Sequence, residues 1–237
     1  MKVKNIDVES ETLELFSLTH NYNKWLIQKI APWVKGRILE VGCGIGNLTS
    51  LIPKQDLLVS IDVSNTYIED MKKKYCNIRN FQVFKHDIVE GKNSKLRKFR
   101  FRTVICSNVL EHIQKEDKAL KNLLQILESG GRLILLVPAL KSLFTTLDVS
   151  LGHHRRYTKK ELKQRLEKNG FVVEKCLYLN LIGIVGWFLN GKILKRQMLS
   201  ANQVIFYDKL IPFIKVIEKM LGPPIGLSLI FVCRKPS

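Results

Sequence analysis

The sequence predicts an α/β protein built on a doubly wound, seven-stranded and mostly parallel sheet. Seven short apolar segments alternate with helical patterns along 237 residues, as strands and helices do in βαβ units. The first of these segments, residues 37–41, runs into three alternate glycines, which is typical of a buried strand that turns sharply towards a helix. With 46% apolar residues, the chain is large enough for one full α/β domain over residues 1–237.

Residues 1–35 are expected to form a helical cover over one end of the sheet. Between residues 12 and 34 the apolar side chains recur at spacings of three and four, which indicates an amphipathic helix or a broken helix pair. The cofactor-binding core is expected over residues 36–178, a helical insert or lid over 179–225, and the last strand in 226–237.

The glycines after the first strand indicate a ligand that approaches the backbone closely. A dinucleotide fingerprint, G-x-G-x-x-G, is matched by Gly42 and Gly44 but has Asn47 in its third position. Glu40 also argues against a pyrophosphate at this strand end, because two negative groups would meet there. The carboxylate would instead favour a cationic ligand such as S-adenosylmethionine.

This segment resembles the class I S-adenosylmethionine-dependent methyltransferases. Their E-x-G-x-G-x-G motif is matched by Glu40, Gly42, Gly44 and Gly46, with Cys43 inside the loop. The resemblance implies a Rossmann-like fold with S-adenosylmethionine as cofactor and S-adenosylhomocysteine as product. Most of the chain is similar to ubiquinone-biosynthesis-like small-molecule methyltransferases, and the part after residue 151 resembles a bacterial branch associated with cell-envelope or glycan pathways.

Two acids follow the next two strands, residues 57–61 and 81–84. Asp62 stands at the strand end where α/β nucleotide folds bind ribose hydroxyls. Asp87 matches the family's acid near the adenine amino group. The site is expected to include the residues beside these acids and those that end the fourth strand at 103–107: Val63, Ile88, Ser107 and Asn108.

The connecting helices follow from their caps and apolar spacing. Leu48, Leu51 and Ile52 predict a first helix ended by Pro53, and Ser64 caps a second that runs to about residue 75. A helix over 115–127 is expected to stop at the glycine pair 130–131, before a strand at 132–137. A long connection over 140–157 leads to a helix with a capping box, then to strands at 171–177 and 227–234.

The acceptor side is predicted from two segments. His112 follows the fourth strand, and residues 152–157 form a Gly-His-His-Arg-Arg-Tyr loop at the carboxyl edge of the sheet. A hydroxyl acceptor benefits from a base, for which His112, His153 and His154 are candidates. Arg155 or Arg156 suits an anionic group, and Tyr157 stands beside them. The alternative is a solvated basic loop.

Glu111 and His112 also resemble part of the metal site of RNA 2′-O-methyltransferases. That site has the pattern E-x-x-E-H with a further histidine, and Asn108 stands where the first glutamate would be. Because the pattern is incomplete, the sequence predicts no metal.

The formal net charge of +18 is compatible with a polyanionic partner or with a lysine-rich solvated surface. Motifs of nucleic-acid base methylation are missing after the fourth strand, so a nucleic-acid substrate is not expected. The leading prediction is methyl transfer to a hydroxyl, rather than an amine, of a small, lipid- or glycan-linked anionic acceptor. RNA methylation and a non-catalytic nucleotide-binding module are the alternatives.

The insert over residues 180–224 joins aromatic and aliphatic side chains to lysines, as interfacial helices do. It is expected to cap the acceptor side and to rest on a membrane surface; a lid over a lipid chain, a subunit contact and ordinary core helices are the alternatives. Pro212 is expected to weaken a continuous helix there. Residues 1–11 show no secretory signal and the five cysteines show no metal or disulfide spacing, so a cytoplasmic location is expected, with contact at the inner face of the membrane.

Overall fold

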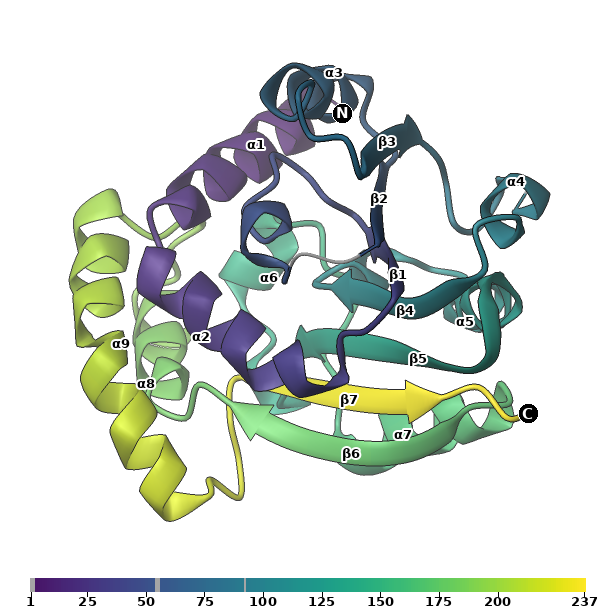
Figure 1. The fold of residues 1–237 in the computed structure, drawn as a ribbon. Helices are drawn as coiled ribbons and strands as arrows, with labels where there is room; N and C mark the ends of the chain where they lie inside the picture. Colours follow the sequence, from purple (N-terminus) through teal and green to yellow (C-terminus); the bar gives the residue numbers. More distant parts are fainter. Residues whose placement is uncertain (1–2, 54–55, 92) are drawn as a thin grey trace.

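The computed structural model describes residues 3–53, 56–91 and 93–237, so the first two residues of the predicted N-terminal cover and residues 54, 55 and 92 lie outside it. At its centre is a seven-stranded sheet in the order β3-β2-β1-β4-β5-β7-β6 (Figure 1). The first five strands in this order are parallel, and β7 runs antiparallel between β5 and β6. The predicted sheet is therefore confirmed. Its strands are β1 (Arg37–Val41), β2 (Leu57–Asp62), β3 (Phe81–Lys85), β4 (Phe101–Ser107), β5 (Leu127–Pro138), β6 (Val172–Leu179) and β7 (Ser228–Arg234).

Helices cover both faces of the sheet (Figure 1). The buried side chains of α5 and α7 pack on one face, and those of α2 and α9 on the other. The α-helices are α1 (Val3–Ser17), α2 (His20–Ile30), α3 (Asn65–Lys74), α4 (Ser94–Arg97), α5 (Glu116–Ile126), α6 (Thr146–Ser150), α7 (Lys159–Lys168), α8 (Gly183–Trp187) and α9 (Ala201–Leu221). Short helical turns lie at η1 (Ala31–Trp33), η2 (Thr49–Leu51), η3 (Leu110–His112), η4 (Lys141–Leu143) and the π-helix η5 (Phe188–Ile193).

The strand order places the end of β1 at the switch point of the sheet. β1 has β2 on one side and β4 on the other, with Val41 opposite Ile61 and Cys106. Open α/β sheets bind ligands beyond the carboxyl ends of their strands at such a point. The glycine turn at residues 42–46 therefore begins where the fold favours a ligand.

The predicted helix after the glycine turn is wrong. Only the short turn η2 (Thr49–Leu51) forms there. Pro53 disfavours the α conformation in the preceding residue, and Ile52 is accordingly extended, with a ψ of 129°.

The predicted stop of the helix at the glycine pair is also wrong. α5 ends at Ile126, and β5 begins at the next residue, where Leu127 pairs with Phe101. Gly130 lies within the strand with φ +70°, and its N–H donates to the carbonyl of Lys235 at 3.1 Å. Pairing with β4 and contact with the C-terminal segment thus outweigh the tendency of glycine to end a helix.

The insert is helical, as predicted, but α9 continues through Pro212. A proline cannot donate to the carbonyl four residues earlier, which here belongs to Asp208. The side-chain amide of Asn21, at the start of α2, donates to that carbonyl at 3.2 Å. The Asp208 carboxylate in turn accepts from the backbone N–H of Tyr22 at 2.9 Å, so α2 and α9 complete one another's hydrogen bonds.

Across residues 3–53, 56–91 and 93–237, no helix combines the length and the apolar character needed to cross a bilayer.

Candidate active site

The glycine turn is packed too closely to accept side chains. Gly42, Gly44 and Gly46 have φ values of +72°, +51° and +83°. A Cβ atom at Gly42 would lie 2.3 Å from Cγ2 of Val109 in the turn after β4. The turn therefore requires glycine, and the segment that carries His112 lies directly beside it.

Helix α1 covers this turn. Its Leu13 lies against Gly44, where an added Cβ would come within 3.2 Å of the leucine side chain. The amide of Asn47 also donates to the carbonyl of Leu13 at 2.9 Å. The N-terminal segment thus packs on the predicted cofactor loop.

Asp62, at the end of β2, holds the glycine turn by its carboxylate. One oxygen accepts from the N–H of Gly44 at 2.8 Å, and the other accepts from the N–H of Ser64 at 2.9 Å. Each carboxylate oxygen has two lone pairs, so the group keeps acceptor capacity for hydroxyls of a ligand. Val63, which follows it, is exposed.

Asp87 lies beyond the neighbouring strand β3, as the register of Asp62 with Lys85 requires. Its carboxylate is exposed, and one oxygen accepts from the N–H of Val89 at 2.7 Å, which leaves the other for a ligand. The side chain of Ile88 is buried in the main core, so only its backbone is available to a ligand.

Glu40 and Cys43 point into the protein. One Glu40 oxygen accepts from the hydroxyls of Thr49 and Ser60, both at 2.7 Å. Burial raises the pKa of Glu40 to about 7. The two hydroxyls lower this pKa and the nearby Asp62 raises it, but burial has the largest effect. The Glu40 carboxylate is thus buried beneath the turn, and the Cys43 side chain packs with Ile68.

Ser107 and Asn108 end β4 beside the glycine turn. The hydroxyl oxygen of Ser107 is buried and has no hydrogen-bond partner within the described chain. Asn108 has φ +52°, and its N–H donates to the carbonyl of Leu136 at 2.9 Å. The strained asparagine turns the chain from β4 into η3.

Glu111, His112 and His153 form one cluster next to this turn. Their ligand-type atoms all lie within 4.8 Å of one another, and the two imidazole rings meet edge to face at 4.8 Å. Burial raises the pKa of Glu111 to about 8, and burial with the neighbouring histidines lowers the pKa of His112 to about 4. His112 is therefore neutral at neutral pH, and its lowered pKa makes it a weak proton acceptor.

Asp148, in α6, orients this cluster and was missed by the sequence analysis. Its carboxylate accepts from Nδ1 of His153 at 2.9 Å, from Nε of Arg156 at 2.8 Å and from Nε1 of Trp187 at 3.2 Å. Burial would raise the pKa of Asp148, but the hydrogen bonds and the charge of Arg156 outweigh it and the pKa is lowered. His153 and Arg156 lie five and eight residues along the chain and Trp187 lies in the insert, so the capping box with Thr145 is the local signal that marks Asp148.

The structure corrects the predicted roles of the arginines and the tyrosine. Arg156 is 2% exposed, pairs with Asp148 and stacks over Trp187. Arg155 pairs with Glu116, and the Tyr157 hydroxyl donates to Glu116 at 2.6 Å. These groups are satisfied within the protein, so the loop is a structural one that presents His153, and neither guanidinium is free to bind an anionic acceptor.

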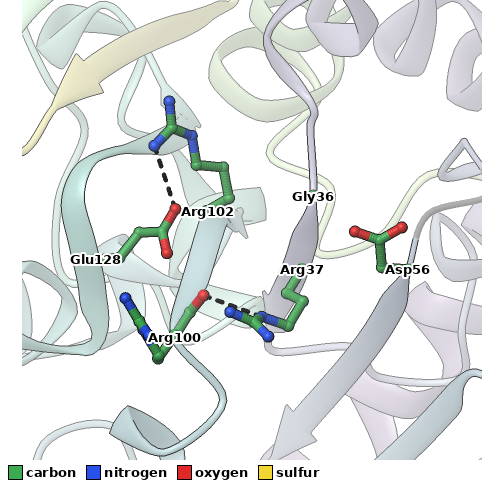
Figure 2. A pocket seen from close by; sticks show the side chains of 6 residues that line it. All are labelled: Gly36, Arg37, Asp56, Arg100, Arg102 and Glu128. Carbon is green, nitrogen blue, oxygen red and sulfur yellow. Dashed lines mark hydrogen bonds and ion pairs between the residues drawn. The ribbon is translucent and has the colours of Figure 1, made fainter.

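A cavity of about 310 Å³ lies at the opposite, amino-terminal edge of the sheet. It is lined by Gly36, Arg37, Asp56, Arg100, Arg102 and Glu128. Figure 2 shows Arg102 directed at Glu128, with 3.2 Å between the charged atoms, and Arg37 bonded to the backbone of Arg100. None of the predicted site residues contributes to it, so we place the active site at the glycine turn.

Comparison with protein families gives a match to a model described as a methyltransferase domain over residues 16–175. A ubiquinone biosynthesis O-methyltransferase of Coxiella burnetii is 30% identical over 116 residues, which cover 46% of either chain. The match thus spans about half the length of the curated relatives.

Solved structures share the fold. An S-adenosylmethionine-dependent methyltransferase from Archaeoglobus fulgidus superposes with a TM-score of 0.58 at 18% identity, over 91% of this chain and 94% of the other. The N-methyltransferase NodS from Bradyrhizobium japonicum, solved in complex with S-adenosylhomocysteine, gives 0.56 at 14% identity, over 90% and 84%.

Proposed function

Because this chain belongs to the class I S-adenosylmethionine-dependent methyltransferases, we propose that it methylates a hydroxyl group of a small, lipid-linked acceptor. The histidine pair beside the glycine turn is the observation that carries the hydroxyl assignment. A thiol or amine acceptor can do without a base, whereas a hydroxyl benefits from one.

S-adenosylmethionine fits the residues at the carboxyl edge. The turn at Gly42–Gly46 has room only for backbone, Asp62 and Asp87 keep acceptor capacity, and the Ser107 hydroxyl has no partner within the described chain. We assign Asp62 to the ribose and Asp87 to the adenine amine. The bound cofactor supplies a methyl group on a sulfonium, which a nucleophile takes by in-line displacement.

The chain then has two tasks at the acceptor. It must hold the hydroxyl in line with the methyl carbon, since correct positioning is worth up to about 7–11 kcal/mol in well-oriented systems. It must also take the hydroxyl proton as the new carbon–oxygen bond forms. We assign this second task to His153, whose imidazole is held by Asp148 and meets the ring of His112 edge to face.

Extracts incubated with the protein and tritiated S-adenosylmethionine should yield a labelled, solvent-extractable methyl ether that resists mild base. The substitution His153→Gln should lower turnover by about a hundredfold, as for loss of a general base, with unchanged affinity for S-adenosylhomocysteine. His154→Gln, an exposed neighbour in the same loop, is the matched control. Label released by mild base, or carried on an amine, would refute the hydroxyl assignment.

The lipid-linked part of the proposal rests on the outer face of α9. Its inner face is buried through Ile211, Ile214 and Glu218. Phe206, Phe213 and Met220 recur every seven residues on the other side and are 64%, 70% and 81% exposed. Neither α2 nor the sheet covers this stripe.

The charge of the insert supports an anionic membrane as its partner. The only two acids of residues 180–224, Asp208 and Glu218, are buried, whereas its basic residues are exposed: Lys192, Lys195, Arg196, Lys209, Lys215 and Lys219. Basic residues near an anionic bilayer contribute about 1 kcal/mol each. An apolar stripe flanked by such cations matches an interfacial helix.

At low salt, the protein should sediment with vesicles that contain phosphatidylglycerol and should stay in solution with purely zwitterionic vesicles. Phe213→Asp should reduce sedimentation at least about tenfold, because a charge replaces an inserted ring. Ile78→Asp makes the same change at a 55% exposed site outside the insert and should have no effect. Equal sedimentation of both variants, or none with the wild type, would leave the stripe as a lid or subunit contact.

A further inference from the structure

Glu111 is a buried carboxyl group without a partner. Its side chain is fully buried, and neither carboxylate oxygen has a hydrogen bond to any part of the chain that the structure describes. An unsatisfied buried polar group costs about 1–3 kcal/mol, and more when it is charged. Such a group calls for a ligand that the protein alone does not supply.

Two imidazoles converge on this carboxylate. His112 is its neighbour on η3, and His153 comes from the loop after α6, with Nε2 at 4.0 Å from Oε1 of Glu111. All three donor atoms lie within 4.8 Å of one another. One carboxylate and two imidazoles therefore face a common point.

The hydrogen bond to Asp148 prepares His153 as a ligand. Because Nδ1 of His153 is engaged by the Asp148 carboxylate at 2.9 Å, its proton is held there and Nε2 keeps a free lone pair. A carboxylate that orients a histidine in this way accompanies most metal-bound imidazoles. Asp148 is itself fixed by Arg156 and Trp187, so the ring orientation is rigid.

We propose that Glu111, His112 and His153 bind a divalent transition-metal ion. Imidazole nitrogens favour ions such as Zn²⁺, Mn²⁺ or Fe²⁺ over Mg²⁺ and Ca²⁺, which prefer sites built from oxygen ligands. Three protein ligands leave at least one coordination position open, as in catalytic metal sites. The sequence pattern predicted no metal because Asn108 replaces a glutamate, but the folded chain provides His153 as the third ligand.

Only a small adjustment is needed to bind the ion. Two ligands that each lie about 2.1 Å from a metal, at angles of about 90–110°, are about 3.0–3.4 Å apart. The 4.0 Å separation between His153 and Glu111 must therefore shorten by about 0.6–1 Å, and any pair at the 4.8 Å limit of the cluster by up to about 1.8 Å. Rotation of the unrestrained Glu111 carboxylate towards the fixed imidazole accomplishes this.

The role of the ion rests on the proposed function. An acceptor hydroxyl at the open position would bind the metal through oxygen, and the positive charge would lower the pKa of that hydroxyl. The histidines would then act as ligands, and the ion, in place of the His153 imidazole as base, would promote loss of the hydroxyl proton. Binding of the ion itself requires neither the acceptor nor the cofactor, so it is tested separately.

Calorimetric titration of untagged, chelator-treated protein with Zn²⁺, and absorption spectra with Co²⁺, test the site. We expect one Zn²⁺ per chain and visible Co²⁺ bands of low-symmetry coordination, with binding weakened at least about a hundredfold in Glu111→Gln and His153→Gln. Asp148→Asn should weaken it about 10–100-fold, as for loss of an outer hydrogen bond to a ligand. Mg²⁺ in place of Zn²⁺ should give much weaker binding.

His154→Gln is the matched control, since it removes an exposed histidine next to His153 and should retain full Zn²⁺ affinity. Absence of stoichiometric Zn²⁺ binding by the folded wild type would overturn the proposal. So would a loss of Zn²⁺ affinity in His154→Gln equal to the loss in His153→Gln. Zn²⁺ binding by the wild type tests the proposal even if a variant fails to fold. Calorimetry with S-adenosylhomocysteine in parallel separates this outcome from a failure of the methyltransferase assignment.

Discussion

Asp62→Ala is expected to raise the dissociation constant for S-adenosylhomocysteine at least about tenfold. Each hydrogen bond to a charged group contributes about 1.5–3 kcal/mol, and the Asp62 carboxylate is placed to accept from the ribose hydroxyls. The variant also loses the bonds from the N–H groups of Gly44 and Ser64, so the glycine turn is held less firmly. Isothermal titration calorimetry measures the change.

Asp70→Ala provides the control for Asp62→Ala. It removes the same charge from the exposed face of α3, where the 4.0 Å pair with Lys73 is worth little. Its affinity should equal that of the wild type. Unchanged affinity in Asp62→Ala, or tighter binding of NAD than of S-adenosylhomocysteine, would refute the assignment of this site.

Arg156→Ala is expected to lower the free energy of unfolding by about 3–5 kcal/mol. Removal of one member of a buried ion pair leaves the other charge uncompensated, and Asp148 is fully buried. The guanidinium also donates to the carbonyl of Ala139 at 3.0 Å and stacks on Trp187 of the insert. Urea denaturation of the wild type and the variant measures the loss.

Lys160→Ala removes an exposed positive charge from the start of α7 and should change stability by less than about 0.5 kcal/mol. The pair of variants also decides between the two roles considered for the loop at residues 152–157. Lost turnover with unchanged stability in Arg156→Ala would restore the acceptor-binding role that the sequence predicted and that the ion pair with Asp148 argues against.

The cofactor side of the site could be predicted because its signals are local. The glycine pattern at Gly42, Gly44 and Gly46 reflects backbone conformations that other residues rarely adopt. Asp62 follows directly from the end of an apolar strand, and parallel strands bring such ends to one edge. Where a local signal competed with pairing elsewhere, as at Gly130 in β5, the prediction was wrong.

The sequence by itself thus determined the order of strands and helices, the family and the cofactor edge, because periodicity, turns and caps involve residues close together in the chain. Only the tertiary structure decided what the polar groups contact. Arg156 became a structural partner of Asp148, Pro212 was accommodated by Asn21, and Glu111 was left buried beside two imidazoles. The physical reason is that burial and hydrogen-bond partners depend on how the whole chain packs, even for residues as close in sequence as Asp148 and Arg156, and a side chain's chemistry follows from what it meets.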